Sequence, residues 1–236
     1  MTASHLLLVD CTLREGEQTA GVWFSKAEKL ALLDALAGAG LALLDAGMPA
    51  VSDEERSFLR EATGRTGARI GASVRALLEE VDLAAEVGCD ELFLICPVSK
   101  LHRETRLGLN SEDAMLRRID AVVRRARSLG RTANVVAEDA SRATWPELSR
   151  ALHAAVDAGA DRLFLCDTVG IWTPSRATSC VSQVREEVPG IPIGVHCHDD
   201  LGMATANTIA ALEAGATVPT ATINGVGERS GNASLA

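Results

Sequence analysis

The sequence IPIGVHCHDD, residues 191–200, is the stretch that decides the fold of this 236-residue chain. Its apolar first half predicts a buried strand, and polar side chains gather where that strand ends. Side chains two apart on a strand point to the same side, so His196 and His198 project together at a spacing that suits one metal ion. Parallel barrels place their active sites at such strand ends.

A second segment near the N-terminus has the same form. Residues 6–9 are apolar, and the sequence DCTLREGEQ follows at residues 10–18. We expect the fold to bring these two strand ends together around a divalent cation. Asp10 and Glu15 are both candidates for its carboxylate ligand, and Arg14 is suited to bind negative charge on a substrate. A local salt-bridge cluster is the alternative interpretation.

The composition excludes several classes of protein. Hydrophobic residues make up 47% of the chain, and the net charge is −9. No basic cluster indicates a nucleic-acid partner, and no apolar run of about 18 residues predicts a membrane span. The N-terminus lacks the pattern of a signal peptide, so we expect a cytoplasmic protein. The six cysteines form no C-x-x-C pair, which fits a reducing compartment.

Short apolar runs alternate with longer amphipathic stretches along the chain. The apolar runs predict strands at 6–9, 41–46, 69–72, 91–96, 134–138, 162–167, 193–198 and 220–224. The amphipathic stretches predict helices at 26–39, 53–63, 76–87, 112–129, 145–158, 174–188 and 204–214. Strands that alternate with helices predict an α/β fold with a parallel sheet, and eight of them favour a closed (β/α)8 TIM barrel over an open sheet.

We expect residues 1–236 to form a single catalytic TIM-barrel domain that stops within the eighth helix. The catalytic groups of such a barrel lie in the loops after its strands. The polar segments of this chain fall in those loops, at residues 10–18, 138–142, 167–170, 196–200 and 224–232.

Five motifs in these loops carry a resemblance to a known family. They are DxTLREGEQ at 10–18, EDASR at 138–142, DTVG at 167–170, HxHDDxGMAxAN at 196–207 and NGxGERxGN at 224–232. The chain resembles the metal-dependent Claisen-condensing barrels, the family of homocitrate, isopropylmalate and citramalate synthases, from about residue 6 to its last residue. It is most similar to homocitrate synthases of the nitrogen-fixation type. Full-length members continue past the barrel into a region, absent here, that contributes a catalytic His and Tyr.

The resemblance implies a metal site and two catalytic residues, Arg14 and Glu138. Glu15, His196 and His198 would be the ligands, and Asn232 matches a position near the metal that is a ligand in some relatives. The metal would be Mg²⁺, Mn²⁺, Zn²⁺ or Fe²⁺, which mixed oxygen and nitrogen ligands suit. Arg14 would hold the ketone oxygen of a 2-oxo acid.

The resemblance also implies roles for residues on the other loops. Glu138 would assist proton transfer, and Thr168 would bind the C1 carboxylate of the acid. Arg142 would pair with the distal carboxylate of 2-oxoglutarate. Gln18 would lie beside Arg14, and His102 is a further candidate for a substrate contact at the mouth of the barrel.

The implied reaction is the condensation of acetyl-CoA with a 2-oxo acid, with 2-oxoglutarate as the leading acceptor and homocitrate as the product. The metal would polarise the ketone, and the enolate of acetyl-CoA would attack it. A homodimer is expected by resemblance. One alternative is a synthase for another 2-oxo acid, such as phosphonopyruvate, pyruvate or 2-oxoisovalerate. A second is a lyase or aldolase that runs the reverse chemistry, although Gly227-Glu228-Arg229 replaces the cysteine-bearing loop of hydroxymethylglutaryl-CoA lyases. A third is a truncated, non-catalytic chain that still binds a metal and an oxo acid.

Overall fold

The computed structural model describes residues 6–235, and its centre is a closed barrel of parallel strands. The strands are β1 Val9–Asp10, β2 Leu43–Asp45, β3 Arg69–Arg75, β4 Glu91–Pro97, β5 Thr132–Glu138, β6 Arg162–Asp167, β7 Ile193–Cys197 and β8 Val218–Ala221. Each strand pairs with the next one along the chain, and β8 pairs with β1 to close the ring. The predicted (β/α)8 TIM barrel is therefore confirmed.

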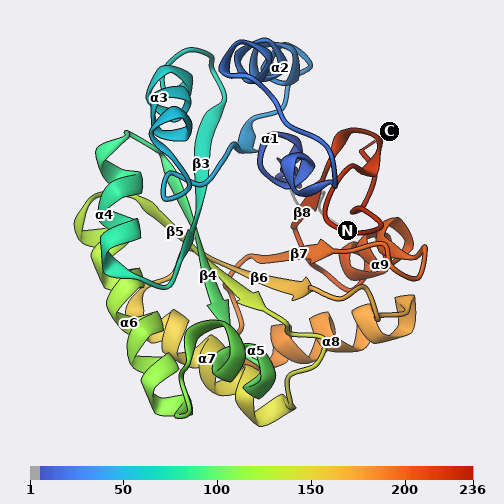
Figure 1. Ribbon diagram of the computed structural model, residues 1–236. Coiled ribbons are helices and arrows are strands. Elements are labelled where there is room, and N and C mark those ends of the chain that lie inside the picture. The colour runs from blue at the N-terminus through green and yellow to red at the C-terminus, as the bar shows by residue number, and fades with distance from the viewer. Residues whose placement is uncertain (1–5, 236) are drawn as a thin grey trace.

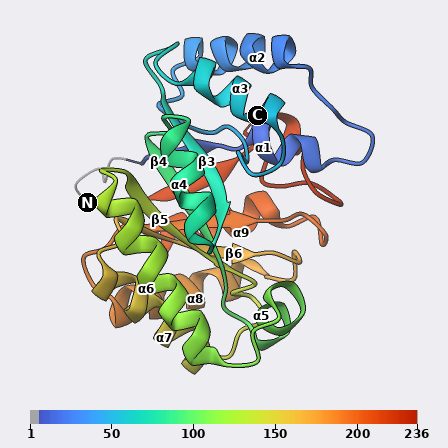
Figure 2. The same cartoon turned by 60° about the vertical axis from the view of Figure 1, so that its left-hand side comes forward.

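Helices surround the barrel and cover its outer face (Figures 1 and 2). They are α2 Lys26–Gly38, α3 Asp53–Ala62, α4 Leu78–Glu86, α6 Glu112–Ser128, α7 Trp145–Ala158, α8 Pro174–Glu187 and α9 Ala204–Glu213. Local sequence sets their starts; for example, Ser25 and Glu28 form a reciprocal capping box at the beginning of α2. Among residues 6–235, no helix combines the length and the hydropathy needed to cross a bilayer.

Short helical turns in the loops after the strands were not predicted. They are α1 Thr12–Glu15, the 3-10 turn η1 Gly16–Gln18, α5 Lys100–Leu107 and the 3-10 turn η2 Ile223–Gly225. The loop that follows η2 lies beside α1, so a segment from near the end of the chain adjoins one from near its beginning (Figures 1 and 2). A hydrogen bond from Thr19 Oγ1 to the carbonyl of Gly227 joins these two loops.

The first and the eighth strands are shifted along the sequence from their predicted positions, and most of the others differ only at their ends. The first begins later than predicted, because only Val9–Asp10 pairs with both neighbours. The eighth ends earlier, because Asn224 adopts a left-handed conformation with φ 55° and the chain turns into η2. Residues 226–235 then form a loop where the sequence predicted the start of an eighth helix.

Two aromatic rings fill the interior of the barrel beneath its open end. Phe93 and Phe164 meet edge to face, with their ring centroids 5.4 Å apart. Each ring occupies space that a glycine on a neighbouring strand leaves empty: a Cβ atom on Gly71 would overlap the Phe93 ring, and one on Gly194 would overlap the Phe164 ring. The two glycines thus make room for an apolar floor across the barrel.

A buried charge cluster closes the opposite, N-terminal end of the barrel. Glu91 is fully buried there at the first position of β4. Its carboxylate accepts hydrogen bonds from Arg162 Nη1 at 2.6 Å and from Asn134 Nδ2 at 3.0 Å, and it pairs with Arg69. Since a buried charge needs partners, the two arginines of this network balance the charge of Glu91.

Candidate metal centre and substrate cavity

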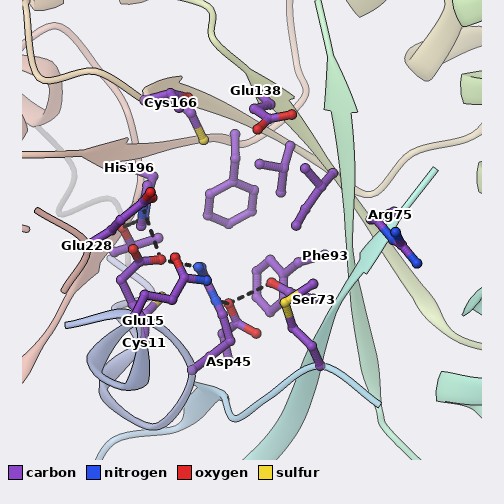
Figure 3. Close-up of a pocket in the computed structure, with 18 of the residues that line it drawn as sticks. Cys11, Glu15, Asp45, Ser73, Arg75, Phe93, Glu138, Cys166, His196 and Glu228 are labelled. Carbon is purple, nitrogen blue, oxygen red and sulfur yellow. Dashed lines mark hydrogen bonds and ion pairs between the residues drawn. The ribbon is translucent and has the colours of Figure 1, made fainter. Parts of the chain in front are cut away.

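A cavity of about 350 Å³ opens at the C-terminal ends of the strands. Its wall includes seven of the residues that the sequence singled out, namely Arg14, Glu15, Gln18, Glu138, Thr168, His196 and His198. Figure 3 shows Glu15 and Asp45 on one side of the cavity and Glu138 on the other. The barrel therefore brings together segments that are far apart in the sequence.

The predicted metal ligands lie side by side in this cavity. His196 Nε2 is 3.7 Å from Glu15 Oε2, and His198 Nε2 is 3.9 Å from Glu15 Oε1. Glu15, His196 and His198 form a triad. All three side chains are buried, and their candidate ligand atoms lie within 4.8 Å of one another. One cation bound at about 2.0–2.2 Å from each atom fits within such a triangle.

Asp10 explains why Glu15, and not Asp10 itself, faces the histidines. Asp10 Oδ1 accepts the backbone N–H of Thr12, and its Oδ2 accepts the Thr12 hydroxyl, both at 2.9 Å. These bonds fold the chain directly into α1, whose last residue is Glu15. Burial raises the pKa of Asp10 to about 6. Of the two candidate carboxylates, Asp10 thus shapes the loop and Glu15 joins the triad.

The charges of the triad suit a cation. Burial opposes the ionisation of Glu15, but Arg14 and the two imidazoles outweigh it and lower the pKa of Glu15 to about 2. Burial lowers the pKa of His196 to about 3 and also lowers the pKa of His198. An ionised carboxylate and neutral imidazoles are the protonation states that bind metals.

His196 is oriented by a neighbour on β8. Its Nδ1 lies 2.8 Å from the hydroxyl oxygen of Thr220. When Nδ1 donates its proton to that oxygen, the lone pair of Nε2 is directed toward Glu15. Asp199 and Asp200, which follow the histidines directly, act elsewhere: Asp199 accepts the N–H of Ala204 at the start of α9, and Asp200 pairs with Arg229.

Asn232 reaches the metal centre from the loop after η2. Its Nδ2 lies 3.2 Å from His196 Nε2, and its Oδ1 is buried with no hydrogen-bond partner among residues 6–235. Gly227 permits this approach, because a Cβ atom on Gly227 would overlap Asn232 Oδ1. The glycines of this loop therefore bring the amide against the triad.

The residues present fit a divalent cation. Besides Asn232 Oδ1, the Oε1 atom of Glu15 is buried and accepts no hydrogen bond from the described chain. Buried oxygens without donors are costly unless something else satisfies them. The carboxylate of Glu15 and the two imidazole nitrogens form a donor set that Mg²⁺, Mn²⁺, Fe²⁺ and Zn²⁺ all accept.

Arg14 is held rigidly beside the triad. Its guanidinium pairs with Glu15, and its Nε donates to Asp45 Oδ2 at 2.8 Å. Asp45 Oδ2 also accepts the hydroxyl of Ser73 at 2.9 Å, and burial raises the pKa of Asp45. Arg14 thus presents a fixed positive charge to the cavity next to the candidate ligands.

The opposite wall combines Glu138 with Thr168. Burial raises the pKa of Glu138, against the effect of Arg106, which pairs with it. The next residue, Asp139, has a left-handed backbone with φ 64°, which is uncommon for a residue with a side chain. This turn directs the N–H of Asp139 to Thr168 Oγ1 at 2.8 Å, so the Thr168 hydroxyl keeps its own proton to donate.

Arg142 and His102 lie behind this wall and are not among the residues that line the cavity. Arg142 Nε donates to Asp139 Oδ1 at 2.8 Å, and its Nη2 lies 2.9 Å from His102 Nε2. The guanidinium that the resemblance assigned to a substrate carboxylate is therefore engaged by the protein in this structure.

Sequence reasoning missed several residues of the cavity wall. They are Ser73, Arg75, Phe93, Arg106, Phe164 and Thr220. For Arg106 a signal was available, because Ser99 accepts the N–H of His102 and so caps α5, which places His102 and Arg106 on one helical face. For Phe93 and Phe164 the signal was their inward position within predicted strands.

Comparison with known proteins places these features in context. The sequence profile of the family described as HMGL-like matches residues 5–236. The protein named Probable 2-isopropylmalate synthase from Ignicoccus hospitalis is 40% identical over 97% of this chain and 57% of its own length. Homocitrate synthase AksA from Methanopyrus kandleri is 40% identical over 98% of this chain and 58% of its own. A provisionally named (R)-citramalate synthase CimA from Methanoculleus marisnigri is 42% identical over 96% of this chain and 44% of its own.

The chain spans about half the length of the curated relatives it matches. Among solved structures, the HMG-CoA lyase of Bacillus subtilis superposes with a TM-score of 0.86 over 98% of this chain and 83% of that one. The sequence identity to that lyase is 21%, so this likeness concerns the fold alone.

Proposed function

This chain belongs to the HMGL-like family, and from that premise we propose that it is an acyl-CoA-dependent transferase that condenses acetyl-CoA with a 2-oxo acid. The observation that carries the proposal is the triad of Glu15, His196 and His198 beside Arg14 in one buried cavity. The names of the curated relatives, which are synthases of homocitrate, isopropylmalate and citramalate, support it.

The triad would hold the divalent cation, with Asn232 beside it. A bound cation would supply Lewis-acid polarisation of the ketone that is attacked. Arg14 would stabilise negative charge that develops on the ketone oxygen, because its guanidinium is already fixed by Glu15 and Asp45 and needs no reorganisation. Gln18 lines the cavity on the same side, within reach of the same substrate.

Residues on the far wall would bind the acid and move a proton. Thr168 would donate its hydroxyl to the C1 carboxylate. Glu138 would accept a proton from the methyl group of acetyl-CoA, and the electron pair left on that carbon would form the new bond to the ketone carbon. Glu138 suits this role because it is a buried carboxylate on the wall opposite the triad.

The first candidate acceptor is 2-oxoglutarate, as the motifs indicate and as the relative from Methanopyrus kandleri supports. Its distal carboxylate needs a cation in the cavity. The arginines that line the described cavity are Arg14, Arg75 and Arg106, and they pair with Glu15 and Asp45, with Glu80 and with Glu138, respectively.

The second candidate acceptor is a 2-oxo acid with a short alkyl side chain, such as pyruvate or 2-oxoisovalerate. A specific observation favours it: the floor of the cavity is apolar. It is formed by Phe93, Ile95, Val136, Phe164 and Cys166. An alkyl group against this floor leaves water without leaving a charge unpaired, whereas a buried carboxylate without a partner is costly.

The proposal is tested by thiol release from acetyl-CoA with Mg²⁺ or Mn²⁺ and a panel of 2-oxo acids, including 2-oxoglutarate, pyruvate, 2-oxoisovalerate and phosphonopyruvate. Acid binding is measured in parallel by calorimetry. Binding without thiol release would favour the non-catalytic interpretation, and neither signal with any acid would overturn the proposal. Release of acetyl-CoA from a 3-hydroxyacyl-CoA would favour a lyase. The homodimer, expected by resemblance, and the cytoplasmic location, expected from the N-terminal sequence, stay predictions.

A further inference from the structure

Helix α5 directs two side chains at one buried carboxylate. His102 and Arg106 are four residues apart and so lie on the same face of the helix. Arg106 Nη1 donates to Glu138 Oε1, and His102 Nδ1 lies 3.4 Å from the same oxygen. Glu138 is the last residue of β5. Helix α5, in the loop after β4, therefore contacts the carboxylate that we propose as the catalytic base.

The two partners of this ion pair differ in their surroundings. The Arg106 side chain is 60% exposed, whereas that of Glu138 is 9% exposed. Both residues line the cavity, which His102 does not. Arg106 thus reaches inward from the rim, with most of its surface in solvent, and neutralises a carboxylate that the barrel has removed from water. Burial alone would favour the protonated, inactive form of that carboxylate.

Few other groups act on Glu138. The charged and titratable groups that face it are Arg106 and His102 on α5, Asp139 next to it in the chain, and the thiols of Cys96 and Cys166 on the flanking strands. Asp139 opposes ionisation of Glu138, and burial holds the pKa values of both thiols well above their usual range, so they stay neutral. Arg106 is therefore the permanent positive charge of this group.

We propose that Arg106 is a positioning residue of the condensation, which keeps Glu138 ionised and oriented in the cavity for proton abstraction from the acetyl-CoA methyl group. The inference rests on the proposed function. The C–H bond of the methyl group breaks, its proton moves to Glu138, and its electron pair forms the carbon–carbon bond to the ketone carbon. The π pair of the ketone moves to its oxygen, which takes a proton from solvent, and hydrolysis of the thioester by water then releases CoA as the thiol. Solvent then removes the proton from Glu138, and Arg106 restores the ion pair.

The first test compares Arg106→Gln with the whole, metal-loaded protein. Without Arg106, ionisation of Glu138 requires a higher pH. The acid limb of the kcat profile therefore moves up by about one pH unit, and kcat at a pH on that limb falls about tenfold while the KM for the acid stays within twofold. Arg106→Lys restores part of the loss. Lys100→Gln is the matched control, since Lys100 is an exposed residue of the same helix that pairs with Glu104 and not with Glu138.

An unchanged acid limb in Arg106→Gln would overturn the inference. So would a rise in the KM for the acid with kcat unchanged, because that pattern would make Arg106 a substrate-binding residue. Equal effects of Arg106→Gln and Lys100→Gln would point to a general disturbance of helix α5 and would also reject it.

A second measurement needs no turnover and separates this inference from the proposed function. Carbon-13 NMR of the glutamate carboxyl groups, with the Glu138 signal assigned by its loss in Glu138→Gln, reports the titration of Glu138 directly. We expect the Glu138 midpoint to rise by about one pH unit in Arg106→Gln and not in Lys100→Gln. If the protein turns over no acid but this shift is seen, the proposed function fails and the control of Glu138 by Arg106 stands. No shift would refute that control even in an active enzyme.

Discussion

Thr220 Oγ1 lies 2.8 Å from Nδ1 of His196, and this contact sets the direction in which the other ring nitrogen points. Partners of this kind fix the tautomer and the orientation of a metal-binding histidine, and their loss typically lowers metal affinity about 10–100-fold. We expect Thr220→Val to lower the affinity for Mn²⁺ within this range while the fold is retained. Titration calorimetry measures the affinity, and Thr208→Val, which removes a hydroxyl bonded within α9, is the control. Equal affinities of Thr220→Val and the wild type would show that Thr220 does not orient the ligand.

The glycine loop yields a prediction about Asn232. Gly227→Ala places a methyl group where Asn232 Oδ1 lies, so the amide must move away from the triad. We expect weaker metal binding in Gly227→Ala and intact secondary structure by circular dichroism. Gly38→Ala is the matched control, because Gly38 is in α2 and a methyl group there meets nothing within 4 Å. Unchanged metal binding in Gly227→Ala would rule out a contribution of Asn232 to the site.

Asp10 yields a prediction about pH and stability. Burial raises its pKa from 3.8 to about 6 in the folded protein. The folded state therefore binds a proton between these values when the unfolded state does not, so the contribution of Asp10 to stability is full below pH 3.8 and is lost as the pH rises through 6. We expect the difference in unfolding free energy between wild type and Asp10→Asn to fall by about 3 kcal/mol over this range. Urea denaturation of the metal-free proteins measures it, and a difference independent of pH would contradict the burial argument.

The cluster at the closed end of the barrel is expected to act on stability alone. Glu91→Ala leaves Arg162 partly buried without its anion, and removal of one partner from a buried pair costs about 3–5 kcal/mol. Metal affinity stays unchanged, because Glu91 lies at the opposite end from the triad. Asp34→Ala, which breaks an exposed pair with Arg65, is expected to change the denaturation midpoint little. A loss of metal binding in Glu91→Ala would show that the two ends of the barrel are coupled.

The apolar floor predicts the response to a cavity-enlarging change. Phe93→Ala removes the ring that crosses the barrel next to Phe164 and costs about 3–5 kcal/mol of stability. The space it opens lets longer alkyl chains into the cavity. We therefore expect the ratio of kcat/KM for 2-oxoisovalerate to that for pyruvate to rise. Thiol release with both acids measures this ratio, and a preference that does not change would mean that the acceptor side chain lies elsewhere.

The barrel and the triad were predictable because their signals are local. Alternation of strands and helices gave the architecture, and the spacing of His196 and His198 on one strand placed both rings on one side. Asp10 and Glu15 could not be told apart from the sequence, because the choice depends on how Asp10 bonds to Thr12 and turns the chain.

The far wall was harder to predict, because its contacts join loops that are distant in the sequence. The motif around Arg142 suggested a substrate contact, but the guanidinium lies against Asp139 and His102, which only the folded loops bring together. Arg106 was missed because α5 interrupts what the sequence indicated as a loop. The floor formed by Phe93 and Phe164 depends on Gly71 and Gly194 of neighbouring strands, a complementarity that no single segment contains.

The candidate ligands lie after β1 and at the end of β7, and only β8 separates these two strands in the ring. A cation shared by Glu15 and the two histidines would therefore bridge the seam, the junction at which β8 pairs with β1 and the sheet closes. The barrel could not part between β8 and β1 without releasing a ligand. We expect that binding of the ion slows amide hydrogen exchange most at this seam. The same ion would then take part in the chemistry and stabilise the closed barrel.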